Sequence, residues 1–229
     1  MRPPGKGGRM ILTFATKNYA HWLDLLLRSY RKTNPGRKAK VYLIMEQEDF
    51  DQYKSDELFE YHWIPVKESL NMTMEKTRVK SALRLKTSLI LWELVLNPGK
   101  RFIWADADCI VLKDIQPLLD KLEQYDLLCT MRPWKPVDQQ KLAAGVMGLR
   151  SNPKTVELFA KAARDVWGHW EGWYSDQLHV YANLTEEIKV HSFTEQEHSL
   201  KNDKDTIVMS HHSDGHEDLK NICKEIGAL

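Results

Sequence analysis

Apolar runs alternate with helical patterns along the first half of the chain, and this order is what most constrains the fold. Four segments are predicted to be strands: residues 10–16, 40–46, 61–66 and the run that starts at Arg101. A helical pattern after the first run stops at Thr33 to Gly36, and a longer helix is predicted from about Thr77 to Leu96. A β-α-β-α-β order predicts an α/β fold with a mostly parallel central sheet and helices on both faces.

The second half of the chain is more mixed. Strands are predicted at four places: residues 126–131, 144–150, and short ones within 188–193 and 206–210. Helices are predicted from Pro153 to Trp167 and from Tyr174 to Ala182, with another at the C-terminus. No repeat, low-complexity segment or linker interrupts the pattern, so we predict one domain over residues 1–229.

Composition excludes several classes of protein. Apolar residues make up 42% of the chain and charged residues 28%, the balance of a folded globular protein. A net charge of +1 gives no electrostatic reason to bind nucleic acid. No run of eighteen apolar residues predicts a membrane span, and no apolar secretory region follows the basic N-terminus, so we expect a cytoplasmic protein with reduced cysteines.

Two carboxylates interrupt the apolar stretch "FIWADADCIVL", residues 102–112, which reads as a buried strand. Residues i and i+2 of an extended segment point to the same side, so Asp106 and Asp108 could converge on one point. A divalent cation with a preference for oxygen ligands would relieve their repulsion. The alternative is that one aspartate caps a turn while the other is solvated.

The long helix before this stretch carries two charges on its apolar face. At 100° per residue, Lys86 and Glu93 lie in the middle of a stripe of apolar residues: Val79, Ala82, Leu83, Leu89, Ile90 and Leu94. A lysine there must extend its ammonium group to water or meet an anion, since an unpaired buried charge is costly. Lys86 is therefore a candidate partner for a phosphate or a carboxylate.

Several motifs, taken in order, resemble the GT-A glycosyltransferases, which move a sugar from a nucleotide diphosphate to an acceptor. These motifs are "ILTFATKNY", the basic residue at Lys86, the DxD of residues 106–108, "AAGVMGLRSNP", the Asp-Gln pair in "WYSDQLHVY", and "HxxG" within "IVMSHHSDG". The likeness is nearest to the glycogenin- and galactosyltransferase-like type. It implies a single GT-A, Rossmann-like domain, with residues 9–112 as the nucleotide-sugar half and residues 113–229 as the acceptor half.

The resemblance also implies a metal-dependent reaction. Asp106, Asp108 and His212 would hold Mn²⁺ or Mg²⁺, and the metal together with Lys86 would stabilise the charge on the departing diphosphate. His211 and His212 face opposite ways on an extended segment, so only one of them can be a ligand, and the family pattern favours His212.

The remaining implied roles concern the donor and the acceptor. The nucleoside, with uridine favoured, would contact Phe14, Ala15, Thr16, Tyr19 and Ala107, although Tyr19 could instead face the core. Asp176 and Gln177 would lie at the reacting carbon, with Asp176 acting as a general base or as a stabiliser of positive charge. A helix cap is the alternative for Asp176.

Aromatic residues suggest where an acceptor sugar could bind. Trp134 and the group Trp167, Trp170, Trp173 and Tyr174 could offer apolar platforms to sugar rings, or could be part of the core.

Two other functions compete with hexose transfer from a UDP-sugar to a glycan or another hydroxyl acceptor. A haloacid-dehalogenase-like phosphatase would use Asp106 as a nucleophile, but that fold usually opens with its DxD strand, whereas three strands come first here. The second competing function is a GT-A-like module that binds a nucleotide sugar or glycan without catalysis. Such a module has no physical need to keep the charges of Asp106, Asp108 and Lys86 together, because grouping them is costly.

Overall fold

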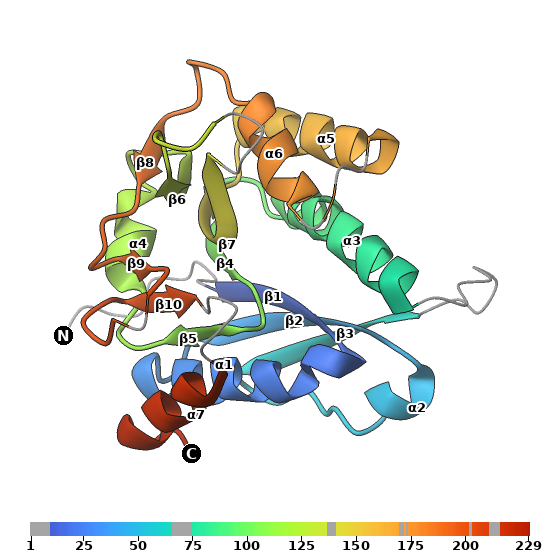
Figure 1. The fold of residues 1–229 in the computed structure, drawn as a ribbon, viewed down its shortest axis with the longest axis vertical. Coiled ribbons are helices and arrows are strands. Elements are labelled where there is room, and N and C mark those ends of the chain that lie inside the picture. The colour runs from blue at the N-terminus through green and yellow to red at the C-terminus, as the bar shows by residue number, and fades with distance from the viewer. Residues whose placement is uncertain are drawn as a thin grey trace.

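The computed structural model describes residues 10–65, 75–136, 141–169, 172, 174–201, 203–210 and 216–229, with backbone alone for 75–83 and 216–218. Its first half has the predicted alternation (Figure 1). The elements are β1 (Met10–Thr16), η1 (Lys17–Tyr19), α1 (Ala20–Thr33), β2 (Lys38–Met45), α2 (Gln47–Phe50), β3 (Phe59–Pro65), α3 (Glu75–Leu96) and β4 (Arg101–Ala105). Strands β1 to β4 are parallel to one another, in the order β3-β2-β1-β4.

Three later strands extend this sheet. They are β6 (Leu127–Met131), β7 (Leu142–Arg150) and β8 (Val190–Ser192), and the full order is β3-β2-β1-β4-β7-β6-β8. Strand β7 is antiparallel to both β4 and β6, while β8 is parallel to β6. The mostly parallel sheet predicted from the sequence is therefore confirmed.

Helices cover both faces of the sheet, as Figure 1 shows with α1 below it and α3, α5 (Pro153–Gly168) and α6 (Ser175–Ala182) above it. Alternate residues of β1 point to opposite faces, so Ile11 is buried with Leu26 of α1, and Leu12 with Ile90 of α3. A short helix, α4 (Gln116–Lys121), joins the α1 side. The two cores hold the sheet rigid, and this fixes the positions of the loops at its edges.

The stretch from 102 to 112 is not one strand, which corrects the sequence prediction. Strand β4 ends at Ala105, the chain turns, and β5 (Cys109–Val111) belongs to a separate sheet of order β5-β10-β9. The N–H of Cys109 donates to the carbonyl oxygen of Asp106 at 3.0 Å, which closes a four-residue turn. Aspartate favours such turns because its side chain can bond to nearby backbone, and the apolar pattern on either side hides the break.

The small sheet joins distant parts of the sequence. Strand β10 (Val208–Ser210) pairs antiparallel with β5 and parallel with β9 (His198–Ser199), so that Ser210 lies opposite Cys109. The last helix, α7 (His216–Glu225), packs on α1 through Leu219 and Ile222. Among the described residues, no helix is both long and apolar enough to cross a membrane.

Candidate active site

The two aspartates lie in the turn at the carboxyl end of β4, at the edge where ligands bind in open parallel sheets. Their side chains are half-buried. Burial and the negative charge of Asp108, against the opposing effect of Lys86, together raise the pKa of Asp106 to about 6. The carboxylates therefore interact, although the turn, and not an extended strand, brings them together.

Lys86 lies on the buried face of α3, where the helical pattern placed it. Its side chain is 3% exposed, and its Nζ is 2.8 Å from Oδ1 of Asp106 and 3.0 Å from Oδ2 of Asp176. Burial alone would lower the pKa of Lys86, but these two carboxylates raise it above its ordinary value. The prediction that Lys86 meets an anion is confirmed, and the anion is a pair of protein carboxylates.

The carboxylate of Asp106 is held on several sides. Its Oδ1 accepts a hydrogen bond from Nε1 of Trp104 at 2.8 Å as well as the ion pair, and its Oδ2 is 3.0 Å from Nζ of Lys86. A Cβ atom at Gly145 of β7 would lie 3.6 Å from Oδ2 of Asp106 and 3.3 Å from Oγ of Ser210. The glycine in "AAGVMGLR" thus keeps the space beside the carboxylate free of a side chain.

Asp176 and Gln177 lie in the first turn of α6. The helix begins after Tyr174, and the 4% exposed Asp176 turns its carboxylate to Lys86, so it is not the capping residue that one reading of the sequence suggested. Gln177 is half-buried, and its Oε1 accepts a hydrogen bond from Nη2 of Arg132 at 3.2 Å. Sequence reasoning missed Arg132, because nothing in the local pattern connects the residue after β6 with α6.

The predicted nucleoside contacts divide into exposed and buried residues. Tyr19 is 46% exposed, so the core alternative for it is wrong. Tyr19 follows the carboxyl end of β1, which pairs with β4, and burial together with the charges of Asp108 and Asp106 raises its pKa. The side chains of Ala15 and Ala107 are buried in the core on the α1 side of the sheet.

Phe14 and Thr16 keep part of their surface accessible. Phe14 packs its ring against Trp104, with 5.8 Å between the centroids. Thr16 is half-buried at the end of β1.

Of the metal ligands proposed from the sequence, only Asp106 and Asp108 are among the residues that the structure describes. His211 and His212 lie outside the described residues, and within the described part of the chain no three His, Cys, Asp or Glu side chains are grouped for a metal. The two carboxylates still fit a cation that prefers oxygen ligands, because they are half-buried and interact electrostatically.

The aromatic residues proposed for the acceptor differ in their surroundings. Trp134, in the loop after β6, is 73% exposed, and Trp167 is 48% exposed with its Nε1 donating to Oγ of Ser88 at 3.1 Å. Tyr174 is half-buried, and Trp170 and Trp173 lie outside the described residues. Trp134 and Trp167 are thus available to a ligand.

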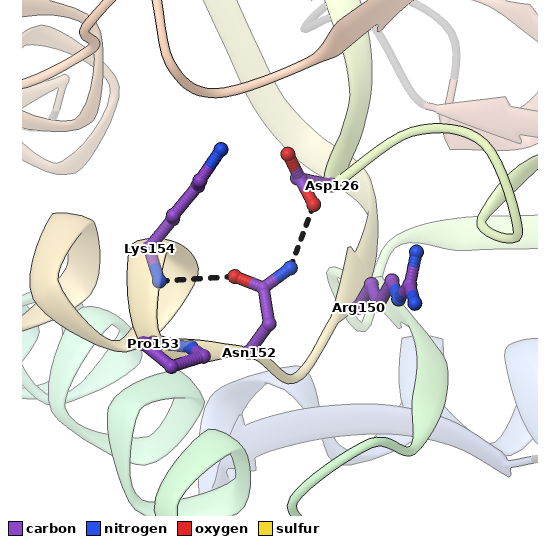
Figure 2. Close-up of a pocket in the computed structure, with 5 residues that line it drawn as sticks. All are labelled: Asp126, Arg150, Asn152, Pro153 and Lys154. Atoms are coloured by element: carbon purple, nitrogen blue, oxygen red, sulfur yellow. Dashed lines mark hydrogen bonds between the residues drawn. The ribbon is translucent and has the colours of Figure 1, made fainter.

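A cavity of about 320 Å³ lies at the opposite edge of the sheet (Figure 2). Arg150 lines it and pairs in register with Arg101, at the start of β4, so the cavity is remote from the carboxylates at the end of that strand. Asn152 uses its side chain to cap α5 and to donate to Oδ1 of Asp126 at 2.6 Å (Figure 2). These polar groups stabilise the helix start, so we assign the active site to the other edge.

The sheet order and the acidic turn at the carboxyl end of β4 are those expected of the GT-A fold. Three solved structures share this fold. The apo structure of the bifunctional glycosyltransferase WbbM matches 99% of this chain and 51% of its own, with a TM-score of 0.63 and 11% identity. The glycosyltransferase GlyE of Streptococcus pneumoniae TIGR4 matches 90% of this chain and 56% of its own, with a TM-score of 0.56 and 15% identity.

The third structure is the galactosyltransferase LgtC, solved with donor and acceptor sugar analogues. It matches 96% of both chains, with a TM-score of 0.55 and 12% identity. This chain spans a little over half the length of the first two structures and nearly the whole of the third. No curated protein sequence matches it significantly.

The family is shown by sequence. The model of the nucleotide-diphospho-sugar transferase family matches residues 49–216, well over half of the chain, and the chain belongs to this family.

Proposed function

We propose that the protein transfers a hexose from a UDP-sugar to a hydroxyl group of a glycan or another acceptor, with the help of Mn²⁺ or Mg²⁺. One observation carries the proposal: the ammonium group of Lys86 lies within 3.0 Å of carboxylates from both the DxD turn and α6. This contact joins the turn expected to bind the donor to the helix expected to carry the acceptor-side residues.

The charges of the cluster support cation binding. The carboxylates of Asp106 and Asp176 contact Lys86, and the charge of Asp108 raises the pKa of Asp106, so acidic groups outnumber the one ammonium group in this cluster and give it an excess of negative charge. A divalent cation would neutralise this excess, and carboxylate oxygens suit Mg²⁺ and Mn²⁺. Asp106 and Asp108, with His212 as an expected third ligand, would hold the cation.

Each residue of the proposed site then has a distinct task. A bound cation would supply Lewis-acid stabilisation of the leaving diphosphate. Lys86 adds positive charge to the same region and keeps the carboxylates of Asp106 and Asp176 at fixed positions before substrate binds. Tyr19, exposed beside the carboxylates, is placed to stack on the base of the nucleoside.

Asp176 would act on the sugar side. The ion pair with Lys86 holds its carboxylate in place, and there it would accept a proton from an acceptor hydroxyl or stabilise positive charge on the reacting sugar. These two tasks belong to inversion and retention of configuration respectively, and the proposal covers both.

The competing functions make different demands. Family membership removes the support for a haloacid-dehalogenase-like phosphatase. A binding module without catalysis would bind a nucleotide sugar but would not hydrolyse it when acceptor is absent.

Thermal unfolding with a panel of ligands tests the proposal. UDP-glucose, UDP-galactose, UDP and GDP are compared with and without Mn²⁺, since a ligand in excess of its Kd raises the melting temperature by mass action. Asp108→Asn should abolish the metal-dependent part of the shift, whereas Asp120→Asn, an exposed carboxylate on α4, should leave it intact. Equal shifts for the wild type and Asp108→Asn would contradict the metal assignment.

Turnover is measured on the same samples as release of UDP from the UDP-sugars. Metal-dependent release supports an enzyme. Binding with no release at any protein concentration, with or without sugar acceptors, would support the module instead.

A further inference from the structure

Trp104 contacts the first aspartate of the acidic turn from inside the core. It lies in β4, and its side chain is fully buried on the α3 side of the sheet, the side on which Asp106 meets Lys86. The indole Nε1 donates a hydrogen bond to Oδ1 of Asp106 at 2.8 Å. The carboxylate is therefore tied to the core of the protein as well as to Lys86.

The indole ring has little freedom to move. The ring of Phe14 packs against it, with 5.8 Å between the centroids, and Nζ of Lys86 lies 6.0 Å from its centre. A side chain in a closely packed core keeps one rotamer, so the N–H group of Trp104 keeps one direction. The core thus fixes the position of Oδ1 of Asp106 before any ligand binds.

These contacts leave Asp106 one oxygen for a cation. An ionised carboxylate has about four acceptor positions on its two oxygens. Oδ1 accepts from both Trp104 and Lys86, at 2.8 Å each, whereas Oδ2 accepts from Lys86 alone among the described residues, at 3.0 Å. The ammonium group thereby spans both oxygens, which is the position that a cation bound to both would need. Oδ2 is also the oxygen beside which Gly145 leaves space.

We propose that Trp104 is a positioning residue that restricts Asp106 to binding a cation through one oxygen, and that the site in consequence prefers Mg²⁺ to Ca²⁺. The inference rests on the proposed function and deepens it. Ca²⁺ takes a larger and more variable set of oxygen ligands and often binds both oxygens of a carboxylate, whereas Mg²⁺ requires nearly octahedral geometry with short bonds. A fixed carboxylate that offers one oxygen meets the requirement of Mg²⁺ and gives Ca²⁺ one ligand too few.

Trp104→Phe tests this role, because it keeps an aromatic ring and removes the N–H group. The carboxylate of Asp106 can then turn about its Cβ–Cγ bond and offer both oxygens. Loss of a residue that holds a metal ligand usually changes metal affinity by about 10- to 100-fold, so the affinity for Ca²⁺ relative to Mg²⁺ should rise about tenfold or more.

Trp63→Phe is the matched control. The Nε1 of Trp63 also donates a hydrogen bond of 2.8 Å, to the carbonyl oxygen of Met45, but Trp63 lies on the edge strand β3, at the far side of β2 and β1 from β4. This variant loses the same kind of hydrogen bond and should keep the ratio of the wild type.

Electron paramagnetic resonance of free Mn²⁺ measures binding of the metal alone, without nucleotide or turnover. Mg²⁺ and Ca²⁺ are then titrated separately against bound Mn²⁺ in the wild type and in each variant, and the two midpoints give the ratio of affinities. Asp108→Asn should lose Mn²⁺ binding, which would locate the signal at the acidic turn.

The outcomes are distinct. A ratio in Trp104→Phe equal to that of the wild type would overturn the positioning role and leave the proposed function standing. The wild type gives a second test, which serves if the melting temperature shows that Trp104→Phe is unfolded: tighter binding of Ca²⁺ than of Mg²⁺ would overturn the inference. If the wild type binds no Mn²⁺, or Asp108→Asn binds it equally well, the metal part of the proposed function fails, and this inference fails with it.

Discussion

His198 should make the protein lose stability in mild acid. Its ring is 3% exposed, with Nδ1 2.6 Å from Oγ1 of Thr130 and Nε2 2.7 Å from Oγ of Ser210. Burial lowers its pKa from 6.5 to about 4, so the unfolded chain takes up the proton first as the pH falls. The stabilising effect is complete above pH 6.5 and is lost between about 6.5 and 4. At about 1.4 kcal/mol per pKa unit, the full loss is about 3 kcal/mol.

Urea unfolding, followed by tryptophan fluorescence, measures this loss at pH 7.5, 6.0, 5.0 and 4.5. His198→Gln is the control, because other groups titrate equally in both proteins and cancel in the difference. The variant should be less stable at pH 7.5, and the gap should narrow as the pH falls. A gap that stays constant from pH 7.5 to 4.5 would show that His198 does not titrate with folding, and the reasoning would be refuted.

Three further substitutions have defined expectations. Lys86→Met should lower the free energy of unfolding by about 3–5 kcal/mol at pH 7.5, since it leaves two carboxylates without their counter-ion, and by less at pH 5. Urea unfolding at the two pH values checks this, and the same loss of stability at both would contradict it. Gly148→Ala puts a methyl group 2.7 Å from the side chain of Leu128 and should cost about 1–3 kcal/mol; a melting temperature equal to the wild type's would disprove the close packing. Glu93→Gln weakens a buried ion pair with Lys40, 2.9 Å long, and should cost about 1–3 kcal/mol; calorimetry that shows no loss would count against it.

The order of elements was predictable because apolar periodicity is local. Residues of β1 and α3 carry their pattern within a few positions, so both elements and their buried faces could be read from the sequence, including the buried Lys86 and Glu93. The turn after Ala105 could not, because apolar residues continue beyond it and hide the change of sheet.

For contacts within the site, the sequence predicted the type of partner but not which residue it would be. Burial required Lys86 to find an anion, but which carboxylates it meets depends on how α3, β4 and α6 pack, and the chain separates Lys86 from Asp176 by 90 residues. Arg132 gave no signal at all, because it follows a strand and its partner Gln177 lies in a helix 45 residues further along the chain. The resemblance to a family supplied Asp176 and Gln177, which periodicity could not.

The pairing of β10 with β5 has a consequence for the newly made chain. Cys109, next to the acidic turn, leaves the ribosome about a hundred residues before its partner Ser210. During that interval the main sheet can form from its four earliest strands, while one side of the turn still lacks its neighbouring strand. A growing polypeptide would thus acquire its scaffold well before it could acquire activity.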